Sequence, residues 1–293
     1  MSAYAANLVV IVGLNAAFAL GLNIISGMCG QVSLGHAAFI GVGAYAAALL
    51  AKAGFSMWLT VPVAGAMAAL VGVLVGLTAL RVREDFLAIT TMGVGFVFLG
   101  VVRKQDWLGA EMGISGIPEA GVPVGMFALI VLALVAAAVL LSLQIARSWL
   151  GFSFAAIADD EDVTRLLGVD VTRRKLLAFA LGTLIAGLAG GLYTHYTRFV
   201  IPDAFGFVLS ISALSMVVIG GVGSTFGVLL AAIVLTLLPE LFRVVNAYKL
   251  ALYGALLLAV MRFAPDGLAG LIARASASWR GGSAVGPGAE TGR

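Results

Sequence analysis

The stretch 146–175, ARSWLGFSFAAIADDEDVTRLLGVDVTRRK, gathers five basic and five acidic side chains. The flanking stretches 121–145 and 176–197 hold no Lys, Arg, Asp or Glu. Each flank is long enough to cross the hydrocarbon core of a bilayer, which takes about 20 apolar residues. We therefore interpret 146–175 as a helical connection in water between two membrane spans, and the expected fold follows from this contrast.

Composition places the whole chain in a membrane. Of its 293 residues, 62% are hydrophobic and 11% are charged, against about 25% charged in soluble domains. The apolar runs are continuous rather than alternating, which excludes a β-barrel and predicts an all-α integral membrane protein, a polytopic helical bundle. Residues 1–51 contain no charged side chain, so the N-terminus lacks the basic region of a cleavable signal peptide and is interpreted as a retained span.

The hydropathy pattern predicts about eight to nine spans, some of them broken helices. The candidates are 4–25, 34–51, 59–80, 86–102, 123–143, 176–196, 205–222, 226–242 and 249–263. Between Asp203 and Glu240 two arrangements are open: two full spans joined by a tight turn, or broken half-helices buried in the protein. We expect residues 1–272 to form the membrane domain and residues 273–293 to form a disordered cytoplasmic tail.

Basic side chains set the expected orientation, because cytoplasmic loops carry an excess of Lys and Arg. Arg147, Arg165 and the basic run 173–175 place the charged segment in the cytoplasm. Counting spans from there puts 81–85 on the same side and the N-terminus outside. The chain is therefore expected to be a multi-pass protein of the cell membrane.

The charged segment has the pattern of two short helices. The carboxylates of 159–162 can cap a helix that begins there, and Gly168 supplies its C-terminal break. Apolar side chains at helical spacing, among them Phe152 and Leu166, form a stripe, and Trp149 is expected to be buried. We predict a helix–turn–helix, a cytoplasmic coupling element, across the inner face. The alternative is a solvated connecting loop.

A polar, uncharged stretch, GQVSLGH at 30–36, opens the second apolar run. Its glycines predict a broken helix whose free N–H groups suit a substrate carboxylate or carbonyl. The residues predicted to line a substrate pathway are Gln31, Ser33, His36, Asn23 and Thr91. The alternative is that Gln31 and Ser33 cap a helix and bond to a neighbouring span, and that His36 is a structural histidine.

Several chemistries are excluded by what the sequence lacks. Cys29 is the only cysteine, which excludes an intrachain disulfide and a cysteine-based zinc site. The glycine-rich run 220–227 lacks the Gly-Lys pair of a phosphate-binding loop and is interpreted as a close helix turn. No Ser–His–Asp set or HExxH motif occurs, and no basic patch suits nucleic acid. We expect no catalytic residue, no metal site and no enzymatic activity.

Four blocks of sequence resemble the permease subunits of branched-chain amino-acid ABC importers. They are GQVSLGHAAFIGVGAY at 30–45, GISGIP at 113–118, FAAIADDEDVTRLLGVDVTRRKLLAF at 154–179 followed by AGLAGGL at 186–192, and LSISALSMVVIGGVGS at 209–224. The blocks occur in the family's order, and the overall pattern is similar to the LivM-type membrane subunit. The chain departs from the family at Ala158, where an arginine is usual, and at Phe96, where a glutamate is frequent.

The resemblance implies a role shared among several subunits. This chain would form half of a translocation pathway in the bacterial inner membrane, beside a homologous second permease subunit. Two cytoplasmic ABC ATPase subunits would bind ATP and Mg²⁺, so that this chain would hold no cofactor. An extracytoplasmic solute-binding protein would deliver a branched-chain or hydrophobic amino acid. The segment 146–175 would be the coupling loop, with ATPase contacts expected at Ala155, Ala156, Asp159, Glu161, Leu167 and Gly168.

Other functions are open at this point. The same type of permease serves urea, short amides and other small solutes. An ion-coupled secondary transporter would need acidic residues inside its spans, and the proposed spans lack any between their ends. A membrane-embedded enzyme or assembly scaffold would need a His/Asp cluster at one interface, which two isolated histidines do not supply.

Overall fold

The fold is a bundle of helices joined by short connections. The computed structural model describes residues 3–79 and 84–241, and a few isolated positions between 254 and 270. The elements are α1 (Ala3–Leu22), the π-helical turn η1 (Asn23–Met28), α2 (His36–Lys52), α3 (Met57–Ala79), α4 (Glu84–Lys104), the 3-10 turns η2 (Asp106–Leu108) and η3 (Ala110–Met112), α5 (Val124–Arg147), α6 (Trp149–Asp159), α7 (Glu161–Leu166), α8 (Val171–Thr197), the 3-10 turn η4 (Pro202–Phe205), α9 (Phe207–Gly220) and α10 (Thr225–Leu241). The predicted all-α class is confirmed, since one isolated bridge between Ile114 and Val200 is the only β pairing within these residues.

Six helical stretches of the described chain are long and apolar enough to cross a bilayer. They are Tyr4–Met28, Met57–Thr78, Phe86–Lys104, Val124–Arg147, Val171–Thr197 and Pro202–Gly220. The helices His36–Lys52 and Thr225–Leu238 are apolar but shorter. The multi-pass helical bundle is therefore confirmed with six candidate spans. The count of eight to nine stays a prediction, because the expected span 249–263 and the tail 273–293 lie almost entirely outside the described residues.

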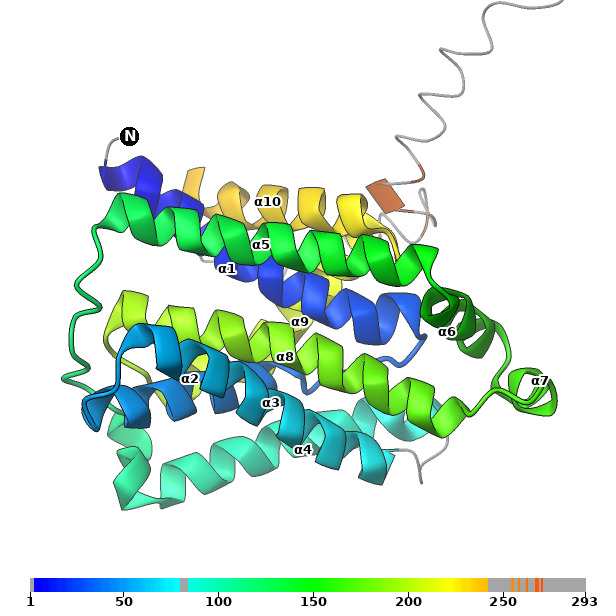
Figure 1. Ribbon diagram of the computed structural model, residues 1–293, viewed down its shortest axis with the longest axis horizontal. Coiled ribbons are helices and arrows are strands. Elements are labelled where there is room, and N and C mark those ends of the chain that lie inside the picture. The colour runs from blue at the N-terminus through cyan, green and yellow to red at the C-terminus, as the bar shows by residue number, and fades with distance from the viewer. Residues whose placement is uncertain are drawn as a thin grey trace, which may run out of the picture.

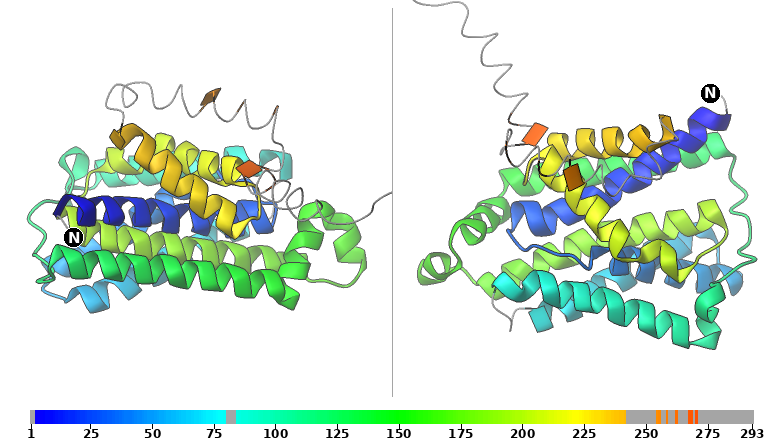
Figure 2. Two further views of the ribbon diagram at one scale, coloured as in Figure 1. Left: turned by 90° about the horizontal axis from the view of Figure 1, so that it is seen from above. Right: turned by 180° about the vertical axis from the view of Figure 1, so that it is seen from behind.

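Helix α8 lies at the centre of the bundle and packs against α1, α2 and α3 (Figure 1). Its 27 residues extend over about 40 Å, which is enough to cross the hydrocarbon core. Helices α5 and α10 also pack against α1. Helix α9 lies behind α1 in the orientation of Figure 1, as the views from above and behind show (Figure 2). Helices α6 and α7 project from one end of the bundle, and the start of α1 lies at the opposite end (Figure 1).

Glycine residues let α8 approach its neighbours at backbone distance. A Cβ atom on Gly190 would overlap the carbonyl oxygen of Ile40 in α2, and one on Gly43 would overlap that of Gly187. A Cβ on Gly187 would lie 2.7 Å from the carbonyl oxygen of Ala64 in α3. Small residues are typical of helix crossings in membranes, where close van der Waals contact drives association. Helices α2, α3 and α8 therefore form one tightly packed unit.

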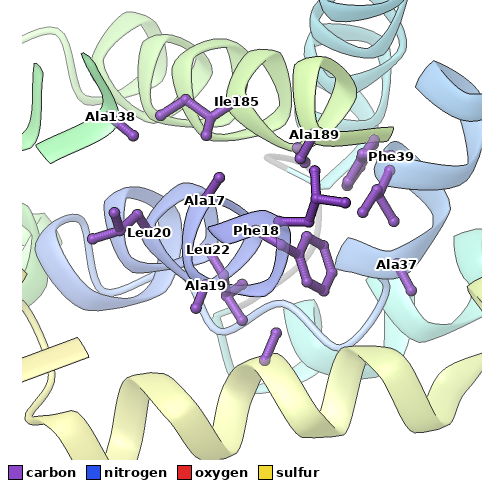
Figure 3. Packing of buried hydrophobic residues seen from close by; sticks show 14 of the residues in the cluster. Ala17, Phe18, Ala19, Leu20, Leu22, Ala37, Phe39, Ala138, Ile185 and Ala189 are labelled. Atoms are coloured by element: carbon purple, nitrogen blue, oxygen red, sulfur yellow. The ribbon is translucent and has the colours of Figure 1, made fainter. Parts of the chain in front are cut away.

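The middle of α1 is buried on every side. The four consecutive residues 17–20 are all buried, although successive residues of a helix point about 100° apart and so cover every side of it. Figure 3 shows α1 between α8, which contributes Ile185 and Ala189, and α2, which contributes Phe39. A helix that is apolar all round is typical of such a fully enclosed position. This burial explains why the first part of the chain carries no charge.

The region 203–240 contains two helices joined by a tight turn. Gly221 and Gly223 have φ angles of 107° and 81°, which only glycine adopts readily, and the predicted close turn in the glycine-rich run is confirmed. The 14 residues of α9 extend over about 21 Å, less than the hydrocarbon core. Helix α9 reaches span length only together with η4, so this hairpin combines features of both predicted arrangements.

The glycine crossings generate a stability prediction. Gly190→Ala places a methyl group on the backbone of α2 and should destabilise the protein by about 1–3 kcal/mol. Gly100→Ala is the matched control, because Gly100 lies within α4 with nothing within 4 Å of its added Cβ and alanine is the better helix former. Thermal unfolding in detergent should separate the two variants. Equal melting temperatures would show that the crossing of α2 and α8 accommodates an added methyl group.

Candidate functional site

The predicted helix break is present between α1 and α2. Helix α1 continues into the π-helical turn η1, and residues 29–35 then run without helical structure to His36. Gly30 has a φ of 72°, and a Cβ there would lie 2.9 Å from the Cα atom of Ala158 in α6. π-Helical turns are frequent at functional sites. The 29–35 segment therefore marks the place where the backbone departs from regular structure inside the bundle.

Hydrogen bonds hold the 29–35 segment against η1 and α8. The Ser26 hydroxyl donates to the carbonyl oxygen of Gln31 over 2.9 Å and accepts from the N–H of Ser33 over 3.2 Å. The Gln31 amide donates to the sulfur of Cys29 at 3.3 Å and to the main-chain oxygen of Lys175 in α8 at 3.5 Å. The alternative that Gln31 and Ser33 cap a helix is wrong, because no side chain caps α2, whereas the bond from Gln31 to a neighbouring span is confirmed.

The start of α2 is supported by hydroxyl groups from two other helices. Thr91 Oγ1 of α4 accepts from the N–H of Leu34 at 3.0 Å, and Ser210 Oγ of α9 accepts from the N–H of Ala37 at 2.9 Å. A Cβ on Gly35 would overlap the carbonyl oxygen of Thr91. At these two positions the N–H groups predicted to receive a substrate already have partners. Ser210 escaped the sequence analysis; its only signal was a hydroxyl in an apolar helix.

Asn23 connects the helix break to the turn between α9 and α10. Its side-chain oxygen accepts from the N–H of Gly223 at 3.0 Å. The Nδ2 atom is buried without a hydrogen-bond partner among the described residues. A Cβ on the nearby Gly27 would lie 2.6 Å from the nitrogen of Gly223, so the two backbones are close. Asn23 therefore positions the α9–α10 turn against η1.

His36, the first residue of α2, is fully buried. Its ring stacks on Phe18 with centroids 4.9 Å apart and meets Phe39 edge-on at 5.9 Å. The backbone of Phe18 approaches the ring, but neither ring nitrogen forms a hydrogen bond of normal geometry within the described chain. The aromatic contacts fix the ring position, and a role in the pathway stays a prediction.

The charged segment 146–175 forms the two short helices that its sequence predicts. The carboxylate of Asp160 accepts from the N–H of Val163 at 2.9 Å and so caps α7. Gly168 follows the end of α7 with a φ of 84°. The predicted cap and the predicted break are both confirmed. Helices α6 and α7 lie beyond the end of the main bundle (Figure 1).

Helix α6 packs one face on the bundle and exposes the other. Phe154 and Ile157 are buried, and Ser153 lies beside them. Trp149 and Phe152 lie outside this face and are 71% and 65% exposed. The expected burial of Trp149 is therefore wrong, because the inward positions at helical spacing belong to other residues. The exposed rings of Trp149 and Phe152 are therefore accessible to another protein.

We name the exposed apolar side chains of α6 and α7 the docking surface. They are Trp149, Phe152, Val163 and Leu166, together with Leu167 just after α7. Leu166 and Leu167 are 87% and 76% exposed. Of the predicted ATPase contacts, Ala155, Asp159, Leu167 and Gly168 are exposed, and Ala156 and Glu161 are half-buried. Their role in coupling stays a prediction.

An enclosed ion pair joins α7 to the start of α8. One carboxylate oxygen of Glu161 pairs with Arg165 at 2.8 Å, and the other pairs with the ammonium group of Lys175. The side chains of Lys175 and Glu161 are 6% and 19% exposed. Because the main-chain oxygen of Lys175 also accepts from Gln31, polar contacts lead from α7 through α8 to the 29–35 segment. In the sequence, Lys175 counted only as one of the basic residues that set the expected orientation.

Three cavities open on the bundle, away from the predicted pathway residues. One of about 440 Å³ lies beside α6 near Met28 and Asp159. Another of about 320 Å³ lies between α1 and α8, and a third of about 280 Å³ lies among α1, α5 and α10. None of the five predicted residues lines these three spaces. No group of three or more His, Cys, Asp or Glu side chains in the described ranges could hold a metal.

Comparison with known proteins identifies the family. A sequence profile described as "Branched-chain amino acid transport system / permease component" matches residues 4–261. The chain belongs to this permease family. The high-affinity branched-chain amino acid transport system permease protein LivM of Escherichia coli K12 is 35% identical, over 85% of this chain and 66% of LivM. The predicted resemblance to LivM-type subunits is thereby confirmed.

Two further relatives show the breadth of the family. The autoinducer 2 import system permease protein LsrC of Enterobacter sp. strain 638 is 29% identical, over 79% of this chain and 69% of LsrC. The high-affinity branched-chain amino acid transport system permease protein LivH of Escherichia coli K12 is 30% identical, over 44% of this chain and 42% of LivH. The matched part spans just under two thirds of the LivM proteins. No solved structure matches the chain.

The contact between Asn23 and the α9–α10 turn generates a prediction. Asn23→Leu keeps the branching at Cγ but leaves the N–H of Gly223 without its acceptor, which should cost about 1–3 kcal/mol of stability. Asn7→Leu, nearer the start of the same helix, is the control and should leave the melting temperature unchanged within error. Thermal unfolding in detergent would test both. A melting temperature equal to wild type for Asn23→Leu would rule out a positioning role.

Proposed function

We propose that this chain is a membrane permease subunit of an ATP-driven ABC importer for branched-chain or hydrophobic amino acids. The observation that carries the proposal is family membership along nearly the whole described chain, with LivM of Escherichia coli K12 as a relative. The all-helical bundle with six candidate spans fits a protein that forms half of a translocation pathway. The chain itself would carry out transport and no chemical reaction.

The partners form part of the same proposal. The chain is similar to both LivM and LivH of Escherichia coli K12, two permease proteins whose names share one transport system, which supports a homologous second permease subunit beside this one. Two ABC ATPase subunits would bind ATP and Mg²⁺ on the cytoplasmic side, and an extracytoplasmic binding protein would deliver the solute. The excess of basic residues in 146–175 supports a cytoplasmic position for α6 and α7 in the bacterial inner membrane.

The docking surface is the proposed seat of the ATPase. Exposed apolar patches mark sites of protein interaction, and here large side chains stand in water at the end of an otherwise lipid-covered molecule. Carboxylates at 159–162 and arginines nearby give this surface a polar rim. An apolar centre with a polar rim is the usual anatomy of a protein interface. A solvated loop would have no need of such side chains.

The ion pair of Glu161 gives a route by which ATPase movement reaches the bundle. Its carboxylate lies between Arg165 of the docking helix and Lys175 of α8, so a displacement of α7 pulls on α8. The main-chain oxygen of Lys175 accepts from Gln31, so the same displacement reaches the helix break. We propose that the break, with Gln31, Ser33, His36, Asn23 and Thr91, is the part of the pathway that responds. Packed units with two arrangements convert small shifts into such switches.

A second solute class has one specific observation in its favour. LsrC, named as an autoinducer 2 import permease, is similar to most of this chain, so the same framework could serve a small polar solute. Urea and short amides fall into this alternative. A secondary transporter is disfavoured, because the described spans contain no acidic residue between their ends that could couple an ion.

Gly168 provides a test of docking and of the solute. Gly168→Leu forces a bulky side chain into a left-handed conformation at the end of α7, at about 1–2 kcal/mol of local strain, and should reduce ATP-driven uptake of labelled leucine by the complete transporter at least tenfold. Gly54→Leu is matched in φ and in open space but lies in the turn after α2, and it should transport normally.

The outcome decides between the proposals. If the unsubstituted transporter takes up no leucine, branched-chain amino acids are not its solutes. Leucine uptake that valine and isoleucine do not inhibit would contradict this solute class as well. Normal solute-stimulated ATP hydrolysis in Gly168→Leu, with an intact complex, would contradict docking at α7.

Glu161 and Asp162 form a matched pair for the coupling route. Both lie in α7 and both pair with Arg165, but only Glu161 contacts the enclosed Lys175. Glu161→Gln removes one carboxylate from the contacts of that ammonium group, so we expect lower stability and more ATP hydrolysed per solute carried. Asp162→Asn should match wild type in both respects. An unchanged ratio of hydrolysis to uptake in Glu161→Gln would remove the ion pair from the coupling route.

A further inference from the structure

A cavity of about 320 Å³ lies between the C-terminal end of α8 and the middle of α1, whereas α6 and α7 precede the N-terminal end of α8. Its walls come from α1, α2, α8, η4 and α9, and the lining residues are Ile11, Leu14, Asn15, Ile40, Tyr193, Tyr196, Thr197, Ala204, Phe205 and Leu209. Its volume falls within the range of small-molecule sites in proteins, about 300–1,000 Å³. None of its residues belongs to the predicted pathway set.

Two facing helices supply matched stripes to this cavity. Ile11, Leu14 and Asn15 of α1 are spaced i, i+3, i+4, and Tyr193, Tyr196 and Thr197 of α8 repeat the spacing. Residues at these intervals share one face of a helix. The cavity therefore lies between one face of α1 and one face of α8.

The cavity and the docking surface lie at opposite ends of α8. Lys175 and Thr197 are 22 residues apart on α8, a distance of about 33 Å at the helical rise. That distance is enough to cross the hydrocarbon core, which is about 30 Å thick. With α6 and α7 in the cytoplasm, the cavity faces the outer side, from which an importer receives its solute.

The lining combines aliphatic walls with an amide that has no partner. Asn15 lies in the middle of the apolar helix α1, is half-buried, and makes no side-chain hydrogen bond within the described residues. A polar group at this depth normally bonds to a neighbouring helix. The aromatic walls are fixed in place, since Tyr193 meets Phe205 edge-on at 5.8 Å and Tyr196 packs on Phe127 at 5.8 Å.

We propose that this cavity is the outer binding subsite for an aliphatic amino acid. Ile11, Ile40 and Leu209 would surround the aliphatic side chain, and the amide of Asn15 would bond to the charged amino acid backbone. Asn offers both a donor and an acceptor, which suits a zwitterion. A lipid chain would use the aliphatic walls but leave Asn15 unpaired. The inference rests on the proposed function and names the place where its solute first binds.

Cysteine accessibility in the complete transporter tests the subsite. Asn15→Cys should react with a charged, membrane-impermeant thiosulfonate added from the outer side, and saturating L-leucine with the binding protein should slow the reaction at least fivefold. Val12→Cys is the matched control, because Val12 lies on the same helix in the separate groove toward α5 and α10, and it should stay unlabelled. The native Cys29 is buried, and its background labelling is measured on the unsubstituted protein.

Each result bears on the subsite. An unlabelled Asn15→Cys would overturn it, since lipid or a partner subunit would then fill the space. Labelling that L-leucine does not slow would overturn it as well. Should Asn15→Cys fail to assemble, Tyr196→Cys serves the same test from α8.

Uptake kinetics separate this inference from the proposed function. Asn15→Leu should raise the KM for L-leucine about tenfold or more, the loss expected for a hydrogen bond to a charged group. Wild-type KM in Asn15→Leu would reject the subsite and leave the importer intact. Absence of leucine uptake by unsubstituted protein would instead reject the proposed function.

Discussion

A helix that breaks inside a membrane protein must find partners for its freed backbone groups, and this requirement organises the bundle. Here the partners are short side chains from three other places in the chain. Ser26 holds the segment from η1, Thr91 reaches it from α4, and Ser210 reaches it from α9. Each bond fixes one more helix against the break. The positions of α4 and α9 therefore depend on satisfying a few N–H groups near the start of α2.

The two ends of the molecule differ in kind and are joined by one helix. At one end α8 begins beside the charged helices α6 and α7, where Lys175 pairs with Glu161. At the other end α8 presents tyrosines to a cavity with aliphatic walls. The helix break lies nearer the charged end, through its contact with the Lys175 carbonyl. Each end also has a cavity: one of about 440 Å³ lies beside α6, and one of about 320 Å³ lies beside the tyrosines.

Local chemistry made part of this structure predictable. The apolar runs, the carboxylates at 159–162, Gly168 and the glycines of 220–227 each act on the backbone within a few residues, so their pattern predicted spans, cap, break and turn. The break at 30–36 was foreseen for the same reason. Sequence comparison of four short blocks was enough to place the chain in its family, which the profile match confirms.

What escaped prediction depends on contacts between residues far apart in the chain. Ser210 supports Ala37 across 173 positions, and no local signal marks that pair. Trp149 was expected inside because it is large, but which face of α6 turns inward is decided by the bundle beneath it. The sequence shows Asn15 only as one polar residue in an apolar helix. Its position in the wall of a cavity depends on α8 and α9, which lie far away in the chain.

The backbone-to-backbone crossings of α2, α3 and α8 bear on how force travels. Helices that touch without intervening side chains have little freedom to shear, so α2, α3 and α8 should move together as one rigid unit. The peripheral helices are different: only 17% of the α4 window and 28% of the α5 window are buried. Changes in membrane thickness and lateral pressure would therefore act mainly on the exposed rim helices, and the enclosed central helices would be shielded from them.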